Sequence, residues 1–403
     1  MNKLVQVEVG GRGRYGEFGG QFVNEMLMPA LIQLEEKFEK HYPQTSFRKK
    51  FENLLKNFGG RPTPLYHAEK FSELIGCRVY LKREDLLYGG SHKLNNTLGQ
   101  ALLAQEMGKN RLITETAAGM HGVATAIAGN ALELDVGVFM GTRDIDRQPS
   151  NVKRMELLGV EITPVKIGRG VLKDAVSDTL REWASCSQDT HYLMGSTVGP
   201  HPFPEMVARF QSVIGREIKN QIIEKEGGLP DAIVACGSGG SNALGAFRPF
   251  IDEDVEFYFV EGGGKSLDAD NSAAAFQVGA PGVIHGALTY TLQDEAGQIK
   301  PSKTRSAGLN YPARGPQLSH LYETGRMKAC YTFDDQVFEA VKMMAKTEGL
   351  IPALETAHAV AYMIDNKEKF GRYETVVLNY SGRGDKDMDT ILRYFDDENR
   401  GKI

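Results

Sequence analysis

The chain has 403 residues, of which 41% are hydrophobic and 25% charged, and its formal net charge is −5. This composition is ordinary for a globular protein of about two domains, and the lack of a basic block argues against nucleic acid or an anionic membrane as a partner. No apolar run reaches the roughly 18 residues that a transmembrane helix needs.

Patterns typical of strands and helices alternate along the chain. The first is a helix predicted over 26–40, where apolar residues recur at helical spacing. The remaining predicted elements, in chain order, are a strand at 78–82, a helix at 94–105, a strand at 111–115, a helix at 119–134, a strand at 136–140, a helix at 149–158, a strand at 160–165, a helix at 172–183, a strand at 232–236, a helix at 243–250, and strands at 256–260 and 375–380. This alternation predicts an α/β protein with two domains, whose twisted, largely parallel sheets are flanked by helices. The stretch 262–316 is rich in Gly, Ala and Pro and is predicted to form long loops of an active-site wall.

The cysteines and the N-terminus bear on the compartment. The four cysteines, Cys77, Cys186, Cys236 and Cys330, form no CxxC pair, so a structural zinc site is not expected and free thiols are typical of a reducing cytosol. The first residues, MNKLVQVEVGGRGRYGEF, have no apolar stretch of the kind found in secretory signals. The sequence therefore predicts a cytoplasmic protein.

Small residues follow three of the predicted strands. The segments are RLITE followed by TAAGMHG, DAIVAC followed by GSGGSN, and ETVVLNY followed by SGRGDKD. In parallel α/β sheets, ligands lie outside the carboxyl ends of the strands, where backbone N–H groups point at anions. A single turn of this kind is equally well explained as the tight end of a strand. Three of them favour a ligand with more than one anionic group.

The GSGGSN turn has a second interpretation. Gly237 and Gly239 after a strand, with Glu261 at the end of the next strand, imitate a dinucleotide-binding motif. Asn242 stands where the third glycine of that motif belongs, so the NAD interpretation is weakly supported. An NAD-dependent oxidoreductase stays open as an alternative at this stage.

The segment LKREDLLYGGSHKLNN places Lys93 behind two glycines and a Ser–His pair, at the start of a predicted helix. A lysine in such a place is most often a solvated surface residue. Its neighbours, however, give the chain a resemblance to the tryptophan synthase β subunits, a family of fold-type-II pyridoxal-phosphate (PLP) enzymes. The matching segments are GRYGEFGGQFV, GRPTPL, LKREDL, GGSHKLNN, LGQALLA, HGVATA, NVKRMELLG, GPHPFP, LPDAIVAC, GGSNA, LQDEAGQIKP, IPALE and SGRGDKD. They run in order over nearly the whole chain, so the resemblance is specific.

The resemblance implies a role for each matching position. Lys93 would carry the Schiff base to PLP and move the substrate Cα proton, and Glu115 would be the acid–base carboxylate beside the leaving group and the incoming nucleophile. The implied cofactor-binding residues are His92, Lys93, Ser238, Gly239, Gly240, Ser241, Asn242, Glu355 and Ser381. The implied substrate-binding residues are Thr116, Ala117, Ala118, Gly119, Met120, His121, Arg147 and Asn310. A monovalent cation, Na⁺ or K⁺, is implied on the backbone of Ser238, Tyr311 and Ala313.

The implied reaction is a β-replacement that turns L-serine and indole into L-tryptophan and water by way of an aminoacrylate. A neutral hydroxyl such as Ser381 near the pyridine nitrogen makes the ring a weaker electron sink than a carboxylate would, which suits elimination at Cβ. An amine next to His92 in a desolvated site has a lowered pKa, as a nucleophile requires. Asp385 and Asp387 are predicted to be structural.

The resemblance further implies the organisation of the molecule. An N-terminal domain would comprise 1–58 and 92–210, with a mobile subdomain at about 108–195, and a C-terminal domain would comprise 59–91 and 211–403, with the active site between them. A β–β homodimer and an α subunit that supplies indole are the implied partners in an α2β2 complex, with Lys173 of the VLKDA segment near the α interface. An exposed helix charge explains Lys173 equally well.

Several positions depart from the family's pattern. The carboxylate-binding loop reads ETAAGMHG where ETGAGQHG is usual, so Ala117 replaces a glycine and Met120 a glutamine. A left-handed backbone at Ala117 would cost about 1–2 kcal/mol. Asn310 stands in place of an aspartate that pairs with the arginine at Arg147 to close the site. Gly237-Ser238 replaces Val-Gly, Leu318 a histidine and Asn24 a proline.

These departures leave the specificity open. Neutral drift in a working synthase is one account, and a β-replacement or β-elimination enzyme with an altered nucleophile or substrate, including a serine or threonine deaminase, is a second. A weakly active regulatory partner of an α subunit is a third, against which the retention of Lys93 and Glu115 argues.

Overall fold

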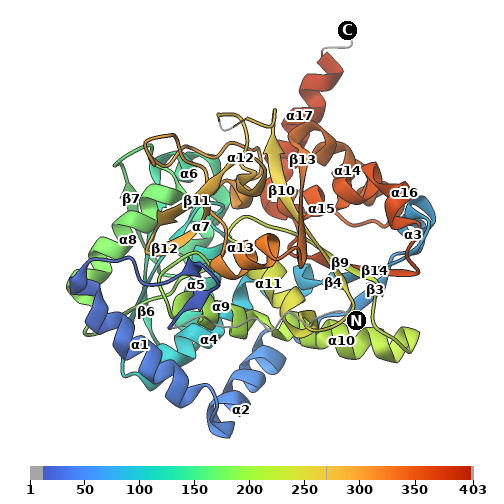
Figure 1. The fold of residues 1–403 in the computed structure, drawn as a ribbon. Coiled ribbons are helices and arrows are strands. Elements are labelled where there is room, and N and C mark those ends of the chain that lie inside the picture. Colours follow the sequence, from blue (N-terminus) through green and yellow to red (C-terminus); the bar gives the residue numbers. More distant parts are fainter. Residues whose placement is uncertain (1–11, 269, 401–403) are drawn as a thin grey trace.

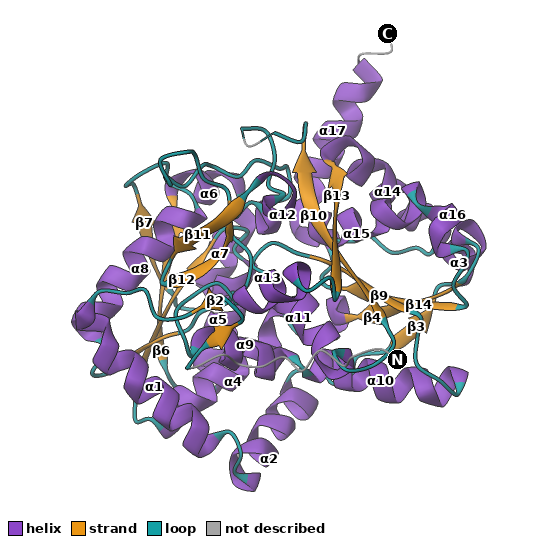
Figure 2. Ribbon diagram, in the orientation of Figure 1, coloured by secondary structure: helices purple, strands orange, loops and turns teal. Residues whose placement is uncertain are grey.

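A computed structural model describes residues 12–268 and 270–400 as three sheets with helices packed around them (Figures 1 and 2). The first part of the segment interpreted as lacking a secretory signal, Met1–Gly11, lies outside the described residues. Within the described ranges, no helix has the length and apolar character needed to cross a membrane.

The first sheet is wholly parallel, with strand order β7-β6-β5-β8. Its strands are β5 (Arg111–Thr116), β6 (Asp135–Gly141), β7 (Glu161–Val165) and β8 (Thr190–Tyr192). The helices of this part are α1 (Met28–His41), α2 (Thr45–Asn53), α4 (Lys93–Glu106), α5 (Met120–Ala131), α6 (Thr142–Arg147), α7 (Pro149–Leu157), α8 (Leu172–Cys186) and α9 (Phe203–Gln211). The strands and most of these helices lie where the apolar spacing predicts them, because both faces of the sheet are covered and the strands are continuous apolar runs.

The second sheet has six strands in the order β13-β10-β9-β14-β4-β3, all parallel except the edge strand β3. Its strands are β3 (Leu65–His67), β4 (Arg78–Arg83), β9 (Ala232–Cys236), β10 (Glu256–Gly264), β13 (Met327–Phe333) and β14 (Thr375–Tyr380). Its helices are α3 (Glu69–Ile75), α10 (Val213–Glu226), α11 (Ser241–Phe247), α14 (Asp334–Thr347), α15 (Leu354–Asp365), α16 (Lys367–Phe370) and α17 (Met388–Arg400). The predicted strands 232–236 and 375–380 are confirmed at both ends.

The prediction of loops alone over 262–316 is wrong. This stretch contains β11 (Ala280–Ile284) and β12 (Ala287–Thr291), an antiparallel hairpin that joins β1 (Arg14–Tyr15) and β2 (Phe18–Gly19) in a third sheet. Short helical segments, α12 (Ala275–Val278) and η5 (Ala307–Leu309), lie on either side of it, and α13 (Pro316–Glu323) follows. The hairpin turns at His285 and Gly286, both with positive φ (46° and 86°), as a two-residue type I′ turn requires. The turn signal was missed because His-Gly is a rare form of it.

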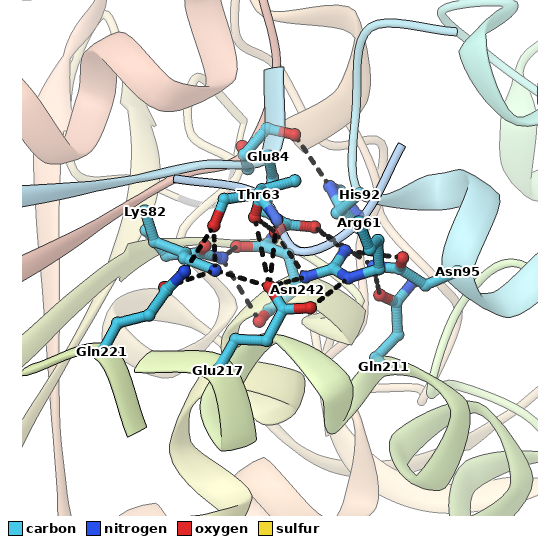
Figure 3. Close-up of polar contacts among 12 residues, drawn as sticks. Arg61, Thr63, Lys82, Glu84, His92, Asn95, Gln211, Glu217, Gln221 and Asn242 are labelled. Atoms are coloured by element: carbon cyan, nitrogen blue, oxygen red, sulfur yellow. Dashed lines mark hydrogen bonds and ion pairs between the residues drawn. The ribbon is translucent and has the colours of Figure 1, made fainter. Parts of the chain in front are cut away.

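A buried charge network lies beneath the first turn of α4 (Figure 3). The Arg61 guanidinium donates two hydrogen bonds of 2.9 Å to Glu84 and two of 2.9 Å to Glu217. Lys82 Nζ donates to Glu217 Oε2 at 2.6 Å. Asn95, two residues after Lys93, accepts from Arg61 Nη1 at 2.8 Å and donates to Glu84 Oε2 at 3.1 Å. Two cations and two carboxylates therefore fix the helix start that presents Lys93.

Replacing Glu84 with glutamine is expected to destabilise the protein by about 3–5 kcal/mol, because it leaves the Arg61 charge buried and only half paired. Burial acts to raise the pKa of Glu84, but the Arg61 guanidinium outweighs it and lowers the pKa to about 2. The stabilisation is therefore full above about pH 5 and is lost as the pH falls toward 2. Chemical denaturation followed by circular dichroism measures the loss. The exposed Glu374, which faces Arg78 at 3.6 Å, is the control, and Glu374→Gln should change stability by under about 1 kcal/mol.

Candidate active site

A cavity opens between the first and second sheets, where the carboxyl ends of their strands face each other. Glu115 and Thr116 end β5, Cys236 ends β9, and Ser381 follows β14, and all four line the cavity. The three small-residue turns singled out in the sequence therefore converge on one space, as the rule for open α/β sheets predicts. Of the predicted catalytic, cofactor and substrate residues, all line this cavity except Gly119, Arg147 and Asn310.

Lys93 is the first residue of α4, and its half-buried side chain faces the cavity. Burial lowers the pKa of its amine; Glu355 opposes this effect and the nearby Lys386 adds to it. His92 is buried beside it, with Nδ1 3.1 Å from Ser381 O and Nε2 3.4 Å from Ser241 Oγ. Burial, and then the Lys93 charge, lower the pKa of His92 to about 3. At neutral pH the imidazole is therefore uncharged, and Lys93 is more easily deprotonated than a surface lysine.

The GSGGSN turn leaves no room for larger side chains. A Cβ added to Gly239 would lie 2.0 Å from Ser196 Oγ, and one added to Gly240, which has φ +84°, would lie 2.0 Å from Leu318 Cδ1. Asn242 Nδ2 donates to Cys236 O at 3.0 Å, which closes the turn onto the end of β9. The bare backbone and the Ser241 hydroxyl form a cradle of the size and donor type that suits a phosphate group.

Ser381 and Glu355 lie on another wall of the cavity. Ser381 Oγ is 2.9 Å from Thr356 Oγ1 and 3.5 Å from Cys236 Sγ, so only neutral groups surround it. Glu355 accepts hydrogen bonds from Gly308 N at 2.7 Å and from Lys386 Nζ at 2.9 Å. Burial acts to raise the pKa of Glu355, but Lys386 outweighs it and lowers the pKa to about 2. The cavity therefore offers a hydroxyl and an ionised, fully paired carboxylate.

Glu115 differs from the other carboxylates because no cation pairs with it. Its Oε2 atom is buried and has no hydrogen-bond partner within residues 12–268 and 270–400. Burial raises the pKa of Glu115 to about 7, with the Tyr192 hydroxyl acting in the opposite direction. A carboxyl group with such a pKa can both give and accept a proton near neutral pH.

The turn from Thr116 to His121 shows why Ala117 is tolerated. The left-handed residue of the turn is Gly119, with φ 78°, and no positive φ occurs at Ala117. A Cβ added to Gly119 would lie 2.3 Å from Asn151 Cβ, whose amide donates to Ala118 O at 2.6 Å. The strain considered for Ala117 is therefore absent, and Gly119 is the position that demands glycine.

Arg147 and Asn310 lie apart from Lys93, in a second cavity. The two cavities are neighbours, because Leu172 and Tyr311 line the first while Lys173 and Asn310 line the second. Asn310 Oδ1 is buried without a hydrogen-bond partner among the described residues. The remaining charged residues of the second cavity are mostly basic: Arg143, Arg169, Lys265, Lys300, Lys303 and Arg305, against Asp174 and Asp334.

The three positions expected to hold a monovalent cation do come together, but a side chain occupies the space between them. Arg314 Nη1 donates to Ala313 O at 3.0 Å, to Tyr311 O at 3.2 Å and to Ser238 Oγ at 3.2 Å. The residues present therefore do not fit a metal ion at this point.

Sequence reasoning missed several residues around the site. Lys386 was overlooked between Asp385 and Asp387, although a lysine flanked by acids in a glycine-rich turn is a signal for a buried ion pair; its Nζ lies 2.7 Å from Asp387. The expectation that Asp385 and Asp387 are structural agrees with their contacts, since Asp387 also accepts from Leu354 N at 2.9 Å and Asp385 pairs with Arg383. Thr356, Tyr192 and Arg314 carried no local signal, because each reaches the site through tertiary packing.

Comparisons with known proteins agree with the site. A family model described as pyridoxal-phosphate dependent enzyme matches residues 56–382. Tryptophan synthase beta chain 1 of Methanosarcina acetivorans is 50% identical over 386 residues, which are 94% of this chain and 96% of that protein. The tryptophan synthase beta chain of Staphylococcus epidermidis is 49% identical over 391 residues, which are 97% of each chain.

Solved structures with the same fold are more distant in sequence. A pyridoxal 5'-phosphate-dependent aspartate racemase has a TM-score of 0.64 at 18% identity, covering 86% of this chain and 97% of its own. A bacterial threonine deaminase has a TM-score of 0.63 at 19% identity, covering 85% of this chain and 98% of its own. These likenesses establish the fold-type-II architecture and do not bear on the substrate.

Proposed function

The chain belongs to the family of the tryptophan synthase beta chains, within the pyridoxal-phosphate-dependent enzymes, and we propose that it joins L-serine and indole to give L-tryptophan and water. The observation that carries this proposal is the pairing of a desolvated lysine, Lys93, with an unpaired carboxyl group, Glu115, in one cavity between two parallel sheets. It is thus a PLP-dependent carbon–oxygen lyase of amino-acid biosynthesis.

The residues of the cavity fit the cofactor. The turn Ser238–Asn242, together with His92, would hold the phosphate, and Lys93 would bind the aldehyde carbon. Ser381 would face the pyridine nitrogen and Glu355 would lie near the ring. When bound, PLP supplies an electron sink for charge that develops at the substrate Cα.

Each step of the proposed reaction then assigns a proton to a side chain of this protein. The Lys93 amine takes the proton from the substrate Cα and later returns it. The Glu115 carboxyl gives a proton to the departing β-hydroxyl and, as a carboxylate, accepts one as indole attacks Cβ. The turn Thr116–His121 binds the substrate carboxylate through backbone N–H groups, with Gly119 shaping the turn and Met120 against the cofactor ring.

Closure of the site is proposed to involve the second cavity. We infer that the subdomain at about 108–195 moves against the 59–91 and 211–403 domain, as in the domain division expected from the sequence, and that Arg147 then meets Asn310. A neutral Asn310 can accept a hydrogen bond from the guanidinium but supplies no charge. Closure therefore protects the dehydrated substrate from water less well than an aspartate would.

Replacing Asn310 with aspartate is expected to lower the ratio of pyruvate to tryptophan about fivefold, since a charge-assisted hydrogen bond to Arg147 gains about 1 kcal/mol over a neutral one. The ratio is measured from the two products at saturating serine and fixed indole. Ser302→Asp adds the same charge to the same cavity and should leave the ratio unchanged. An equal response of both variants would mean that the overall field, and not the Arg147 pair, controls closure.

The partners belong to the proposal as well. A β–β homodimer and an α subunit that delivers indole are expected from the family, and the basic second cavity with Lys173 suits an acidic docking segment of that subunit. Lys173 lies 3.7 Å from Asp174 and is 39% exposed, so its ammonium can reach a partner. A cytosolic location is supported by the four free cysteines. A resident Na⁺ or K⁺ is left out of the proposal, because Arg314 occupies the expected site.

Turnover of L-serine with and without indole, with products identified by mass, tests the proposed function. Tryptophan formed in proportion to indole supports it. Pyruvate and ammonia alone would indicate a deaminase, and a product that requires another nucleophile would indicate an altered β-replacement. No turnover in the presence of an added α subunit would indicate a regulatory role.

A further inference from the structure

Arg314 is the largest fully buried side chain of the protein within the described residues, and its guanidinium is completely enclosed. It lies between η5 and α13, close to the active cavity. Its five N–H groups are all donors and cannot lose their charge in a protein. An enclosed cation of this kind is costly unless every donor meets an acceptor and a carboxylate balances the charge.

The acceptors come from four separate parts of the chain. Nε donates to Glu261 Oε1 at 2.5 Å, in β10. Nη2 donates to Ala273 O, in the segment before α12. Nη1 donates to the Ser238 hydroxyl and to the carbonyls of Tyr311 and Ala313. Glu261 is also fully enclosed, so the pair forms a neutral unit with no other cation in contact among the described residues.

Two of these segments also form the active cavity. Ser238 opens the glycine turn assigned to the phosphate, and Tyr311 lines the cavity beside Leu309. The Ser238 hydroxyl donates in turn to Tyr311 O at 3.1 Å. A group that holds Ser238 and the 311–313 segment together therefore sets the distance between the phosphate cradle and the wall that closes over substrate.

A ring of backbone carbonyls that point inward is the arrangement with which proteins bind a desolvated alkali cation. Here the carbonyls of Tyr311, Ala313 and Ala273 point at N–H groups instead. A metal ion cannot share these oxygens with the guanidinium, because two like charges at contact distance repel strongly in a buried site. One cation or the other can occupy the space.

We infer that the Arg314 guanidinium is a built-in organic cation that assembles this side of the active site, so that the enzyme needs no added alkali or ammonium ion. The inference rests on the proposed function only for the assay of turnover, since unfolding and cofactor absorbance report on the assembled site whatever its substrate.

The first test compares salts on the wild-type holoenzyme at constant ionic strength. Turnover, the cofactor absorbance spectrum and Tm are measured in NaCl, KCl, CsCl, NH4Cl and tetramethylammonium chloride, whose cation is too large for carbonyl ligation. The wild-type values should agree to within about twofold in rate and show no specific shift of Tm, because a site that is already filled gives no ligand-dependent stabilisation. A specific increase with K⁺ or Na⁺ would overturn the inference.

The second test opens the site with Arg314→Ala. The variant keeps Glu261 and the three carbonyls but loses the cation, so it should become dependent on a small one. Turnover in tetramethylammonium chloride should be low and rise about tenfold with saturating KCl or with low-millimolar guanidinium chloride, and the Tm of the variant should rise with the concentration of the same ions. A variant that ignores every cation would show that Arg314 only fills space.

Two further variants keep the outcome decisive. Arg314→Lys retains a charge at the site and should fold without any response to salts, even if the alanine variant does not fold. Arg326 is the matched control, because its guanidinium also donates to backbone carbonyls, those of Phe250, Ile251, Glu253 and Val255, but away from the cavity. Arg326→Ala should lower Tm equally in all salts. Rescue of Arg326→Ala by K⁺ would contradict the assignment of cation dependence to Arg314. If tryptophan is not the product but Tm and cofactor absorbance behave as described, the inference stands and only the proposed function fails.

Discussion

Replacing Lys93 with alanine is expected to abolish the absorbance band of lysine-bound PLP and to reduce turnover to background. Lys93 is the amine that faces the cavity with a pKa lowered by burial, close to the glycine turn. The other lysine of the cavity, Lys386, cannot replace it, because Nζ of Lys386 is held between Glu355 at 2.9 Å and Asp387 at 2.7 Å and its pKa is raised. The variant should still bind PLP noncovalently through the phosphate cradle.

The control for the Lys93 variant is another buried lysine. Lys109 Nζ donates to Gln33, Ser187 and Gln188 far from the cavity, and Lys109→Met should keep the cofactor band and turnover at a lower Tm. Absorbance of the purified proteins and trapping with borohydride measure cofactor attachment directly. Persistence of a borohydride-trapped adduct in Lys93→Ala would move the attachment point to another lysine.

The residues around Lys93 show how far the sequence carries. Parallel strands such as β9 and β14 were placed correctly because each is an uninterrupted apolar run that ends in small residues, and burial on both faces enforces that pattern. The turns at their ends then had to meet, since the carboxyl ends of parallel strands lie along one edge. Local pattern and topology together therefore predicted most of the cavity wall.

What the sequence did not predict depends on tertiary contacts. The hairpin β11–β12 was hidden because its first strand, APGVI, contains proline and glycine and pairs at a sheet edge, where such residues are allowed. Arg314 looked like an ordinary loop arginine, since nothing near it in sequence reveals that Glu261 and Ala273 reach it. The departure at Ala117 seemed costly because the sequence does not give φ, and the structure places the left-handed residue at Gly119.

Glu115→Gln is expected to lower kcat for serine about 10²–10⁴-fold, the usual contribution of a general acid–base group. The amide keeps the shape of the carboxyl but can neither give a proton to the β-hydroxyl nor accept one. A substrate whose leaving group needs no proton separates this role from damage to the site. β-Chloro-L-alanine loses chloride, so its elimination should be reduced far less in Glu115→Gln than that of serine. An equal loss with both substrates would remove Glu115 from the proton transfer.

The stability of the same variant supplies an independent check, because the pKa of Glu115 is raised to about 7 by burial. A carboxyl group whose folded pKa lies above its unfolded value holds its proton more tightly when folded. Its contribution to stability is therefore full below about pH 4 and is lost as the pH rises through 7. Glutamine stays neutral, so Glu115→Gln should match the wild type at pH 4.5 and exceed it at pH 8 by up to about 3 kcal/mol. The exposed Glu182 on α8, 3.8 Å from Arg111, is the control, and Glu182→Gln should show no such gain. A variant that is slower with serine yet more stable at pH 8 identifies Glu115 as a group kept unpaired for chemistry at the expense of stability, and equal stability at both pH values would mean that Glu115 is solvated in the folded protein.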